Sequence, residues 1–258
     1  MLQPHTKDYL LDQKIKIYQP VNGYRASADA VLLSAMVDVS KDKSNILDVG
    51  SGTGAVSLCL AHRTKGKNVT LTGLEIQPEL AELANYSAEQ NGFAFLHYYQ
   101  ADIREKIEKD ICLPCSFDIV VTNPPYSDHD MPSPNKSKSL AHNMHTFNLD
   151  QWLEFCIKMT KPFGTIYMIN RTEALETICH TVKGKCGAIM ILPIFSKQGQ
   201  MAKRIIVSMQ KDSKAISSIL PPLTIHKPDN SYTKEAEAIL RQGKTVAEVL
   251  ALLDNRSK

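Results

Sequence analysis

The stretch Ile46-Leu-Asp-Val-Gly-Ser-Gly-Thr-Gly54 limits the possible folds more than any other part of the chain. Its apolar start predicts a buried strand. Gly50, Gly52 and Gly54 predict a tight turn that opens a helix. Glycines lack the side chains that keep backbone N–H groups away from a ligand, and a helix N-terminus attracts anionic and nucleotide-like groups. We therefore predict a cofactor site at the end of this strand.

Strand and helix patterns alternate after this turn, which is typical of a parallel sheet covered by helices on both faces. A short connection between the last two strands predicts an antiparallel hairpin. The only tryptophan, Trp152, lies at core spacing with Phe155 and Met159, so we expect it to pack inside. The expected strands are 45–49, 69–74, 95–100, 117–122, 165–169, 188–192 and 204–209, and the expected helices are 54–62, 78–91, 149–160 and 173–183.

Polar residues directly follow three of the expected strands. They are Glu75, Asp102 and Asn123. Because crossovers are right-handed, these strand ends meet at one edge of the sheet, together with the glycine turn. Glu75 is placed to accept hydrogen bonds from ribose hydroxyls, and Asp102 to accept one from an exocyclic amine such as that of adenine. The turn also fits a dinucleotide fingerprint, but the residues after the fourth strand and the terminal hairpin argue against NAD.

The tetrapeptide Asn123-Pro124-Pro125-Tyr126 predicts the reaction site. A planar nitrogen attached to a ring or a carbonyl is a poor nucleophile because its lone pair is delocalised. If the Asn123 side-chain oxygen and the Pro124 carbonyl accept hydrogen bonds from its two N–H groups, the lone pair of the nitrogen turns toward an electrophile. The prolines fix the backbone, and Tyr126 offers a ring on which a planar group stacks. The alternative is a proline turn with a structural role only.

Together, these motifs resemble those of class I S-adenosylmethionine-dependent amino-methyltransferases. The block Gln19-Pro20…Gly23-Tyr24-Arg25…Asp29-Ala-Val-Leu-Leu33 is similar to that of the YfiC-like family, the tRNA adenine-N6-methyltransferases that modify the adenine beside the anticodon of a valine tRNA. The resemblance covers about residues 8–210. It implies an α/β, Rossmann-like class I methyltransferase fold with a seven-stranded, mostly parallel sheet that ends in an antiparallel hairpin. It also implies S-adenosylmethionine as methyl donor and S-adenosylhomocysteine as product.

The motifs and the resemblance give a set of expected site residues. The catalytic set is Asn123, Pro124, Pro125 and Tyr126, and the cofactor-binding set is Asp48, Gly50, Gly52, Gly54, Glu75, Asp102 and Asn123. The long polar loop 127–147 is expected to be a substrate lid. Two groups of basic residues either bind phosphates or keep the surface soluble. They are Lys136, Lys138 and His142 in the loop, and Lys203 and Arg204 at the last expected strand. Where family members on that tRNA carry an arginine after the tetrapeptide, this chain has Ala141-His142-Asn143.

The helix expected to begin near Ala28 has a second small cluster at its start. Tyr24, Arg25 and Asp29 gather there, behind the potential cap Ser27. They either close over a substrate or cap the helix and form ion pairs with one another. The spacing favours the second, local interpretation.

Two rival functions stay open at this point. Enzymes that methylate the glutamine side chain of release factors use the same Asn-Pro-Pro-Tyr tetrapeptide, but they usually carry a separate N-terminal helical domain. Only about 44 residues precede the first core strand here. A non-catalytic RNA-binding module is the second rival, and the complete acidic and amide set argues against it. We divide the chain into an N-terminal segment (1–44), a methyltransferase core (45–210) and a C-terminal extension (211–258).

Composition sets only broad limits. A hydrophobic content of 43%, a charged content of 22% and a net charge of +3 fit a globular protein and allow an RNA partner, such as tRNA. Cys112-Leu-Pro-Cys115 has no second ligand pair, so we expect no metal site. The chain begins without a leader pattern and has no membrane-length apolar segment. We therefore expect a cytoplasmic protein, whose oligomeric state the sequence leaves open.

Overall fold

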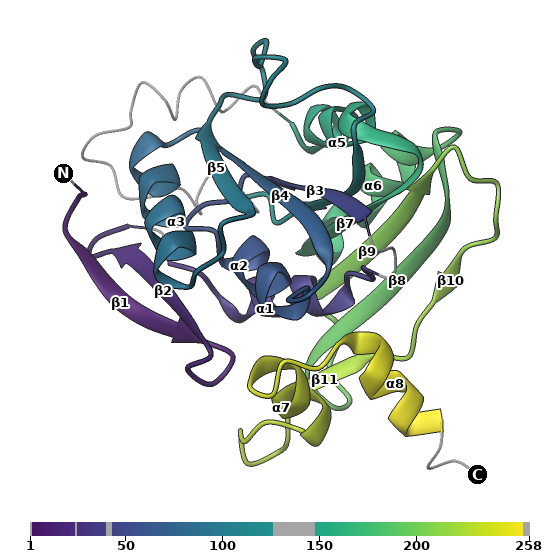
Figure 1. Cartoon of the computed structure of the whole chain (residues 1–258). Coiled ribbons are helices and arrows are strands. Elements are labelled where there is room, and N and C mark those ends of the chain that lie inside the picture. Colours follow the sequence, from purple (N-terminus) through teal and green to yellow (C-terminus); the bar gives the residue numbers. More distant parts are fainter. Residues whose placement is uncertain (1, 24, 40–42, 126–147, 255–258) are drawn as a thin grey trace.

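A central twisted sheet with helices on both faces forms the body of the molecule (Figure 1). The computed structural model describes residues 2–23, 25–39, 43–125 and 148–254, with side chains through residue 251. The strand order is β10-β8-β9-β7-β6-β3-β4-β5, and β11 pairs with β8. All pairs in this sheet are parallel except those made by β9. The predicted α/β fold with a mostly parallel sheet is confirmed.

The glycine turn belongs to the parallel half of the sheet. Here β3 (Lys43–Val49) lies between β4 (Asn68–Glu75) and β6 (Phe117–Thr122), and β5 (Leu96–Gln100) forms the edge. The crossovers contain α2 (Ala55–Arg63) and α3 (Pro78–Gln90), and α3 begins with proline at a first-turn position that needs no N–H donor. The expected strands agree with these bounds to within two residues.

The other half of the sheet ends in the predicted antiparallel hairpin. It contains α5 (Leu149–Met159), β7 (Thr160–Arg171), the short 3-10 helix η1 (Thr172–Ala174), α6 (Leu175–Val182), β8 (Cys186–Lys197) and β9 (Arg204–Lys211). β9 inserts between β7 and β8 and is antiparallel to both. Both β7 and β8 are longer than predicted because Pro162, Gly164 and Pro193 interrupt their apolar patterns in the sequence.

The number of strands corrects one expectation. The described residues form a nine-stranded sheet rather than a seven-stranded one. The seven expected strands are present, and the two additional strands come from the tail: β10 (Ser218–Ile219) and β11 (Leu223–His226) both pair in parallel with β8. Such short strands carry too few residues for an alternating pattern to be recognised.

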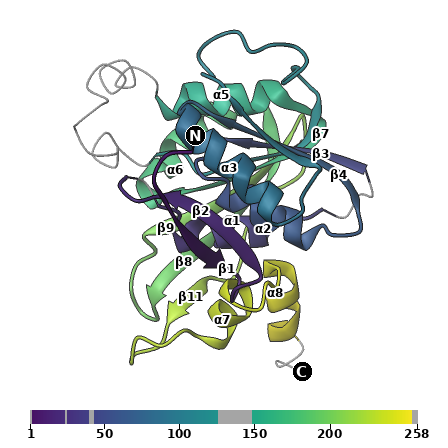
Figure 2. The same ribbon diagram turned by 60° about the vertical axis from the view of Figure 1, so that its left-hand side comes forward.

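The N-terminal segment forms a separate two-stranded hairpin of β1 (His5–Leu10) and β2 (Ile15–Pro20). β1 is polar and only partly buried, whereas β2 is almost fully buried. The hairpin lies beside α3 (Figure 2), where the Tyr18 backbone N–H donates to Ser87 Oγ at 2.9 Å and the Lys16 N–H to Asn91 Oδ1 at 2.9 Å. These bonds satisfy one side of β2 in place of a further strand.

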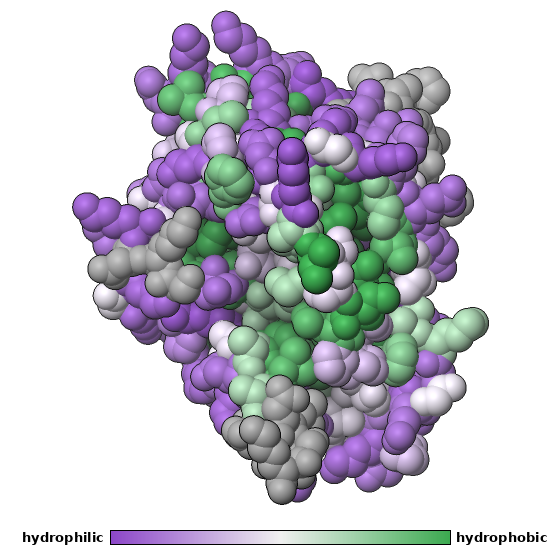
Figure 3. Space-filling view, turned by 90° about the vertical axis from the view of Figure 1, so that its right-hand side faces the viewer, coloured by the Kyte–Doolittle hydropathy of each residue, from purple (hydrophilic) through white to green (hydrophobic). Residues whose placement is uncertain are grey.

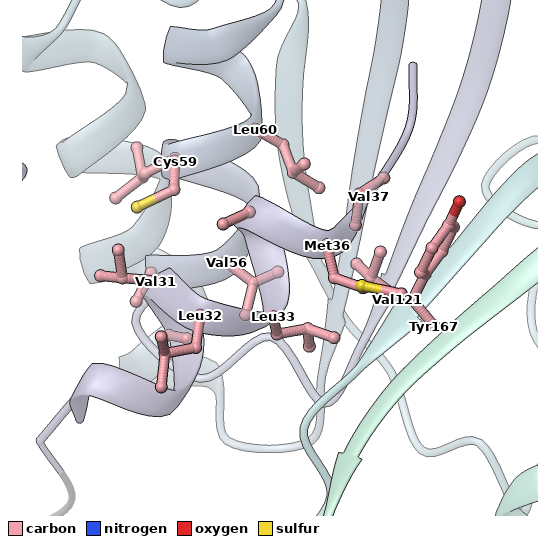
Figure 4. Packing of buried hydrophobic residues seen from close by; sticks show 14 of the residues in the cluster. Val31, Leu32, Leu33, Met36, Val37, Val56, Cys59, Leu60, Val121 and Tyr167 are labelled. Carbon is pink, nitrogen blue, oxygen red and sulfur yellow. The ribbon is translucent and has the colours of Figure 1, made fainter. Parts of the chain in front are cut away.

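Alternate residues of the strands supply two apolar cores, one on each face of the sheet. One core includes α1 (Ala28–Met36), α2 and α3, together with the tail helices α7 (Lys234–Leu240) and α8 (Val246–Asp254). The other includes α5 and α6. Figure 4 shows apolar side chains of α1 directed toward α2 and toward Val121 and Tyr167 of the sheet. Burial on nearly all sides explains why α1 is apolar around its circumference.

Exposed apolar side chains gather over β8 and β10 (Figure 3). In this part of the chain Ile216 is 93% exposed, Ile219 72% and Met190 36%. The predicted site residues lie elsewhere, with the glycine turn, Glu75 and Asn123 at the carboxyl ends of β3, β4 and β6.

Candidate active site

Four strand ends meet at the carboxyl edge of the parallel sheet. Val49 is the register partner of both Leu74 and Thr122, so the turn after β3 lies between the ends of β4 and β6. The backbone N–H groups of Gly50 and Ser51 both donate to the Leu74 carbonyl at 2.9 Å. On the far side of β4, the Ala101 N–H donates to the Glu75 carbonyl at 2.8 Å. The glycine turn, Glu75, Asp102 and Asn123 thus border one stretch of the sheet edge.

The glycines of the turn are required by both backbone angle and space. Gly50, Gly52 and Gly54 have φ values of 70°, 56° and 84°, in the left-handed region that other residues rarely adopt. A Cβ on Gly50 would lie 2.8 Å from the Trp152 ring, and a Cβ on Gly54 would collide with the Tyr98 hydroxyl. The three left-handed positions of the turn are thus glycines, and Ser51 and Thr53 occupy the positions between them.

Glu75 holds the glycine turn in shape. Its Oε2 accepts the Gly52 N–H at 2.8 Å, and its Oε1 accepts the Gln77 N–H at 3.0 Å. The side chain is buried, and this desolvation raises the pKa of the carboxyl above its usual value. The carboxylate therefore both fixes the turn and retains acceptor capacity beside it.

Asp48 lies beneath the turn rather than at its open side. It is 1% exposed, and its Oδ2 accepts a hydrogen bond from Ser57 Oγ at 2.7 Å. Ser57 Oγ in turn lies 3.0 Å from the Tyr98 hydroxyl. Burial raises the pKa of Asp48 to about 7. This network joins β3, α2 and β5, and the sequence analysis missed both Ser57 and Tyr98. Tyr98 lies against Gly54 and Gly73, where a Cβ would collide with its ring, and these contacts depend on the packing of the strands rather than on a local sequence pattern.

Asp102 forms an ion pair that the sequence analysis did not foresee. Arg104 Nε donates to Asp102 Oδ1 at 2.8 Å and to Oδ2 at 2.9 Å. The Arg104 side chain lowers the pKa of the Asp102 carboxyl. Asp102 lies one residue beyond Ala101, whose N–H bonds to the end of β4. The carboxylate is thus held in its charged, accepting form at the predicted position.

Asn123 and the first proline follow β6 directly. Thr122, the last residue of β6, donates from Oγ1 to the Val49 carbonyl at 2.8 Å and accepts from Trp152 Nε1 at 2.8 Å. Asn123 is half-buried, Pro124 buried and Pro125 exposed. Trp152 packs against the core, as expected, but its ring also contacts the glycine turn. It therefore joins the turn to the strand that carries Asn123.

The remaining predicted substrate residues divide into two groups. Arg25 donates from Nη2 to Asp8 Oδ2 at 2.6 Å and from Nη1 to Thr6 Oγ1 at 3.1 Å, so it ties the start of α1 to β1. Ser27 caps α1 by accepting from the Asp29 N–H, which agrees with the local interpretation of this cluster. The others, Tyr24, Tyr126, Lys136, Lys138 and His142, lie outside the described residues, as does the expected lid 127–147.

The structure gives no sign of a metal centre in its described part. No three His, Cys, Asp or Glu side chains come together there as metal ligands would. Cys112 is buried, with its Sγ 3.2 Å from Met159 Sδ, whereas Cys115 is exposed. No described helix is both long and apolar enough to cross a bilayer.

Comparison with known proteins places these features in a family. The model of the family described as "Methyltransferase domain" matches residues 40–236. A tRNA1(Val) (adenine(37)-N6)-methyltransferase of Actinobacillus pleuropneumoniae serotype 5b is 32% identical over 212 residues, which are 81% of this chain and 86% of that protein. One from Photorhabdus laumondii is 30% identical over 222 residues, 84% and 86% of the two chains. A predicted O-methyltransferase from Agrobacterium tumefaciens shares the fold, with a TM-score of 0.69 at 23% identity over 84% of this chain and 97% of that one.

Proposed function

The chain belongs to the methyltransferase-domain family, together with the curated tRNA1(Val) (adenine(37)-N6)-methyltransferases, and from this premise we propose that it methylates N6 of the adenine at that position of a tRNA. The proposed methyl donor is S-adenosylmethionine. The observation that carries the proposal is the position of Asn123 and Pro124, next to the glycine turn at the end of β6. A tRNA substrate also implies a cytoplasmic enzyme.

The glycine turn fits the proposed cofactor. Ser51 Oγ and Thr53 Oγ1 are buried in the turn and have no hydrogen-bond partner among the described residues. A buried polar group without a partner is costly, so a bound ligand with polar atoms would stabilise this turn. Glu75 is placed for the ribose hydroxyls and Asp102 for the adenine amine. When bound, S-adenosylmethionine supplies an electrophilic methyl group.

The reacting nitrogen is activated by two fixed acceptors. The Asn123 side-chain oxygen and the Pro124 carbonyl accept hydrogen bonds from the two N–H groups of the adenine amine. This turns the lone pair of the nitrogen out of conjugation with the ring. The amine then forms a C–N bond to the methyl carbon as the carbon–sulfur bond breaks, and its extra proton leaves to water. The two prolines keep both acceptors in place.

The test is methyl transfer from isotopically labelled S-adenosylmethionine into total bacterial tRNA and, in parallel, into cell protein. We expect label in N6-methyladenosine from tRNA with the wild-type chain. Asn123→Ala should lose this label while it still binds S-adenosylhomocysteine, because the glycine turn and Glu75 are intact. Label in N5-methylglutamine of protein, with none in tRNA, would instead favour the release-factor type of substrate. A chain that binds no cofactor would favour a non-catalytic RNA-binding module.

A further inference from the structure

The carboxyl edge of the sheet changes its charge on the two sides of Asn123. On one side, the ends of β4 and β5 carry Glu75 and Asp102. On the other side the sheet continues from β6 through β7, β9, β8 and β11. The register pairs Arg171 with Arg204 across β7 and β9. It pairs Lys197 with His226 across β8 and β11. We call this side the basic edge and define it as Arg171, Lys197, Lys203, Arg204, His226 and Lys227.

A hollow of about 230 Å³ lies within the basic edge. Ser196, Gln200, Lys203, Arg204 and His226 line it. These side chains bring hydroxyl, amide and cationic N–H donors to one concave surface. Such a set fits phosphate oxygens, which accept several hydrogen bonds and carry negative charge.

Two of the cationic side chains are held in place by the surrounding protein. Arg204 Nη1 pairs with Asp29, whose side chain is 5% exposed, at the start of α1. Lys197 Nζ donates to the Pro228 carbonyl at 3.1 Å. The Arg204 guanidinium carries five N–H donors, so one ion pair leaves others directed elsewhere. Lys203, which lines the hollow, and Lys227, which follows His226 in the chain, are both exposed.

The far wall of the hollow is also fixed. His226 Nδ1 lies 3.1 Å from the Asn230 carbonyl, and its ring stacks on Tyr232 with centroids 5.2 Å apart. The nearby carboxylate of Asp229 accepts hydrogen bonds from the backbone and hydroxyl of Ser231. These bonds hold Asp229 within its own turn, and they lower the pKa of its carboxyl, with a smaller contribution from the nearby Lys227.

Distance along the sheet fits a nucleic acid whose target base lies at Asn123. Neighbouring strands are about 4.8 Å apart. Since β7, which ends at Arg171, is one strand and β11 four strands from β6, the basic edge extends from about 5 Å to about 19 Å from the end of β6. That is the range of the nucleotides next to a base turned into the site.

Resting on the proposed function, we infer that the basic edge binds the backbone phosphates of the tRNA beside the target adenine. The hollow around Lys203, Arg204 and His226 takes one phosphate group, and Lys227 contacts the backbone beyond it. Binding here is independent of base sequence. It sets the direction in which the RNA crosses the enzyme, away from the cofactor half of the sheet edge.

The experiment compares two double variants that remove the same charge. Lys203→Ala/Lys227→Ala changes the basic edge. Lys183→Ala/Lys214→Ala is the matched control, because both of its lysines are exposed at the opposite end of β8 and β9. Binding of an unmodified tRNA1(Val) transcript is measured over a range of salt concentrations. The KM for the same tRNA and the affinity for S-adenosylhomocysteine are measured in parallel.

We expect the basic-edge variant to bind the transcript about tenfold more weakly, with a salt slope reduced by about 2 because two phosphate contacts are lost. Its KM for tRNA should rise, with cofactor affinity and kcat unchanged. The control should match the wild type. If both variants bind the transcript equally well and both still methylate tRNA, the basic edge does not bind phosphates, but the proposed function stands. A wild-type chain that binds cofactor but neither binds nor methylates tRNA overturns both.

Discussion

Trp152 shows how a single residue links the two halves of the candidate site. Its position in a helical apolar pattern predicts core packing, and it does pack on the core below α5. The pattern does not reveal that its indole N–H reaches Thr122 or that its ring lies on Gly50. Those contacts depend on how α5 docks on the sheet, which involves residues far apart in the sequence. The consequence is a tryptophan at the edge of the proposed cofactor site.

Because the chain has one tryptophan, its fluorescence should report cofactor binding. We expect S-adenosylhomocysteine to change the emission of Trp152, since the proposed cofactor site borders the turn that the ring contacts, and a ligand bound there would alter the polarity around the indole. Titration then gives a dissociation constant. Glu75→Ala should move the titration to higher ligand concentration, because the turn loses the bond from the Gly52 N–H to the carboxylate and the segment after β4 loses the bond from the Gln77 N–H. An emission spectrum that stays constant while calorimetry detects binding would contradict this position.

The buried Asp48 carboxyl should make the stability of the free protein depend on pH. Its pKa of about 7 in the folded state is higher than in the unfolded chain. The protonated form is therefore favoured by folding, and this contribution is lost as pH rises toward 7 and above. The unfolding free energy of the wild type should fall between pH 5 and pH 8. In Asp48→Asn, we expect this fall to be smaller by about 2 kcal/mol. Urea unfolding at both pH values measures it.

Asp102→Asn is the control for this prediction. Arg104 lowers the pKa of Asp102, so its contribution is present above the unfolded pKa and lost only in acid. It should leave the difference between pH 5 and pH 8 nearly unchanged. If Asp48→Asn unfolds with the same pH dependence as the wild type, the carboxyl is ionised in the folded state throughout this range.

At the scale of elements, β4 and β5 pack through a contact between a glycine and an aromatic ring. The Tyr98 ring of β5 covers Gly73 of β4, and a Cβ at Gly73 would lie 2.8 Å from Tyr98 Cε1 and 3.0 Å from Ser51 Oγ. The same tyrosine lies against Gly54 at the start of α2. Strand, turn and helix are thus packed around one ring.

Gly73→Ala should destabilise the protein by about 1–3 kcal/mol, because the new methyl group meets a side chain that has no room to move. Tyr98→Leu removes the ring atoms that collide. The loss of unfolding free energy in the double variant should therefore be smaller than the sum of the losses in the two single variants, by at least about 0.5 kcal/mol. Urea unfolding of the four proteins completes the cycle. Additive effects would show that the ring is not the obstacle.

The sequence predicted the long elements well and the short or polar ones poorly. The strands β3, β4 and β6 are buried on both faces and therefore form continuous apolar runs, with clear glycine or proline signals after them. In contrast, β1 is stabilised by pairing with β2, and β10 and β11 by pairing with β8. Such pairing depends on the partner strand rather than on a local pattern.

For the molecule as a whole, the tail is part of the main core and not an appended arm. Residues of α7 and α8 belong to the same apolar cluster as α1, α2 and the sheet. Arg63 of α2 donates to the Lys244 carbonyl at 3.1 Å, and Lys14 of the β1–β2 connection donates to the Gln242 carbonyl at 2.9 Å. The division of the chain at residue 211 stays a prediction from the sequence. These contacts indicate that the last segment folds together with the core.

Two isoleucines of this tail allow a matched test. Ile239 in α7 is fully buried, whereas Ile219 in β10 is 72% exposed. Ile239→Ala should lower the unfolding free energy of the entire chain by about 2–5 kcal/mol, through lost burial and the cavity left behind. Ile219→Ala should change it by less than about 0.5 kcal/mol. Circular dichroism during urea unfolding should show one transition that moves to lower urea only for Ile239→Ala. A separate early transition of small amplitude, with the main one unmoved, would instead mean that the tail unfolds independently of the methyltransferase core.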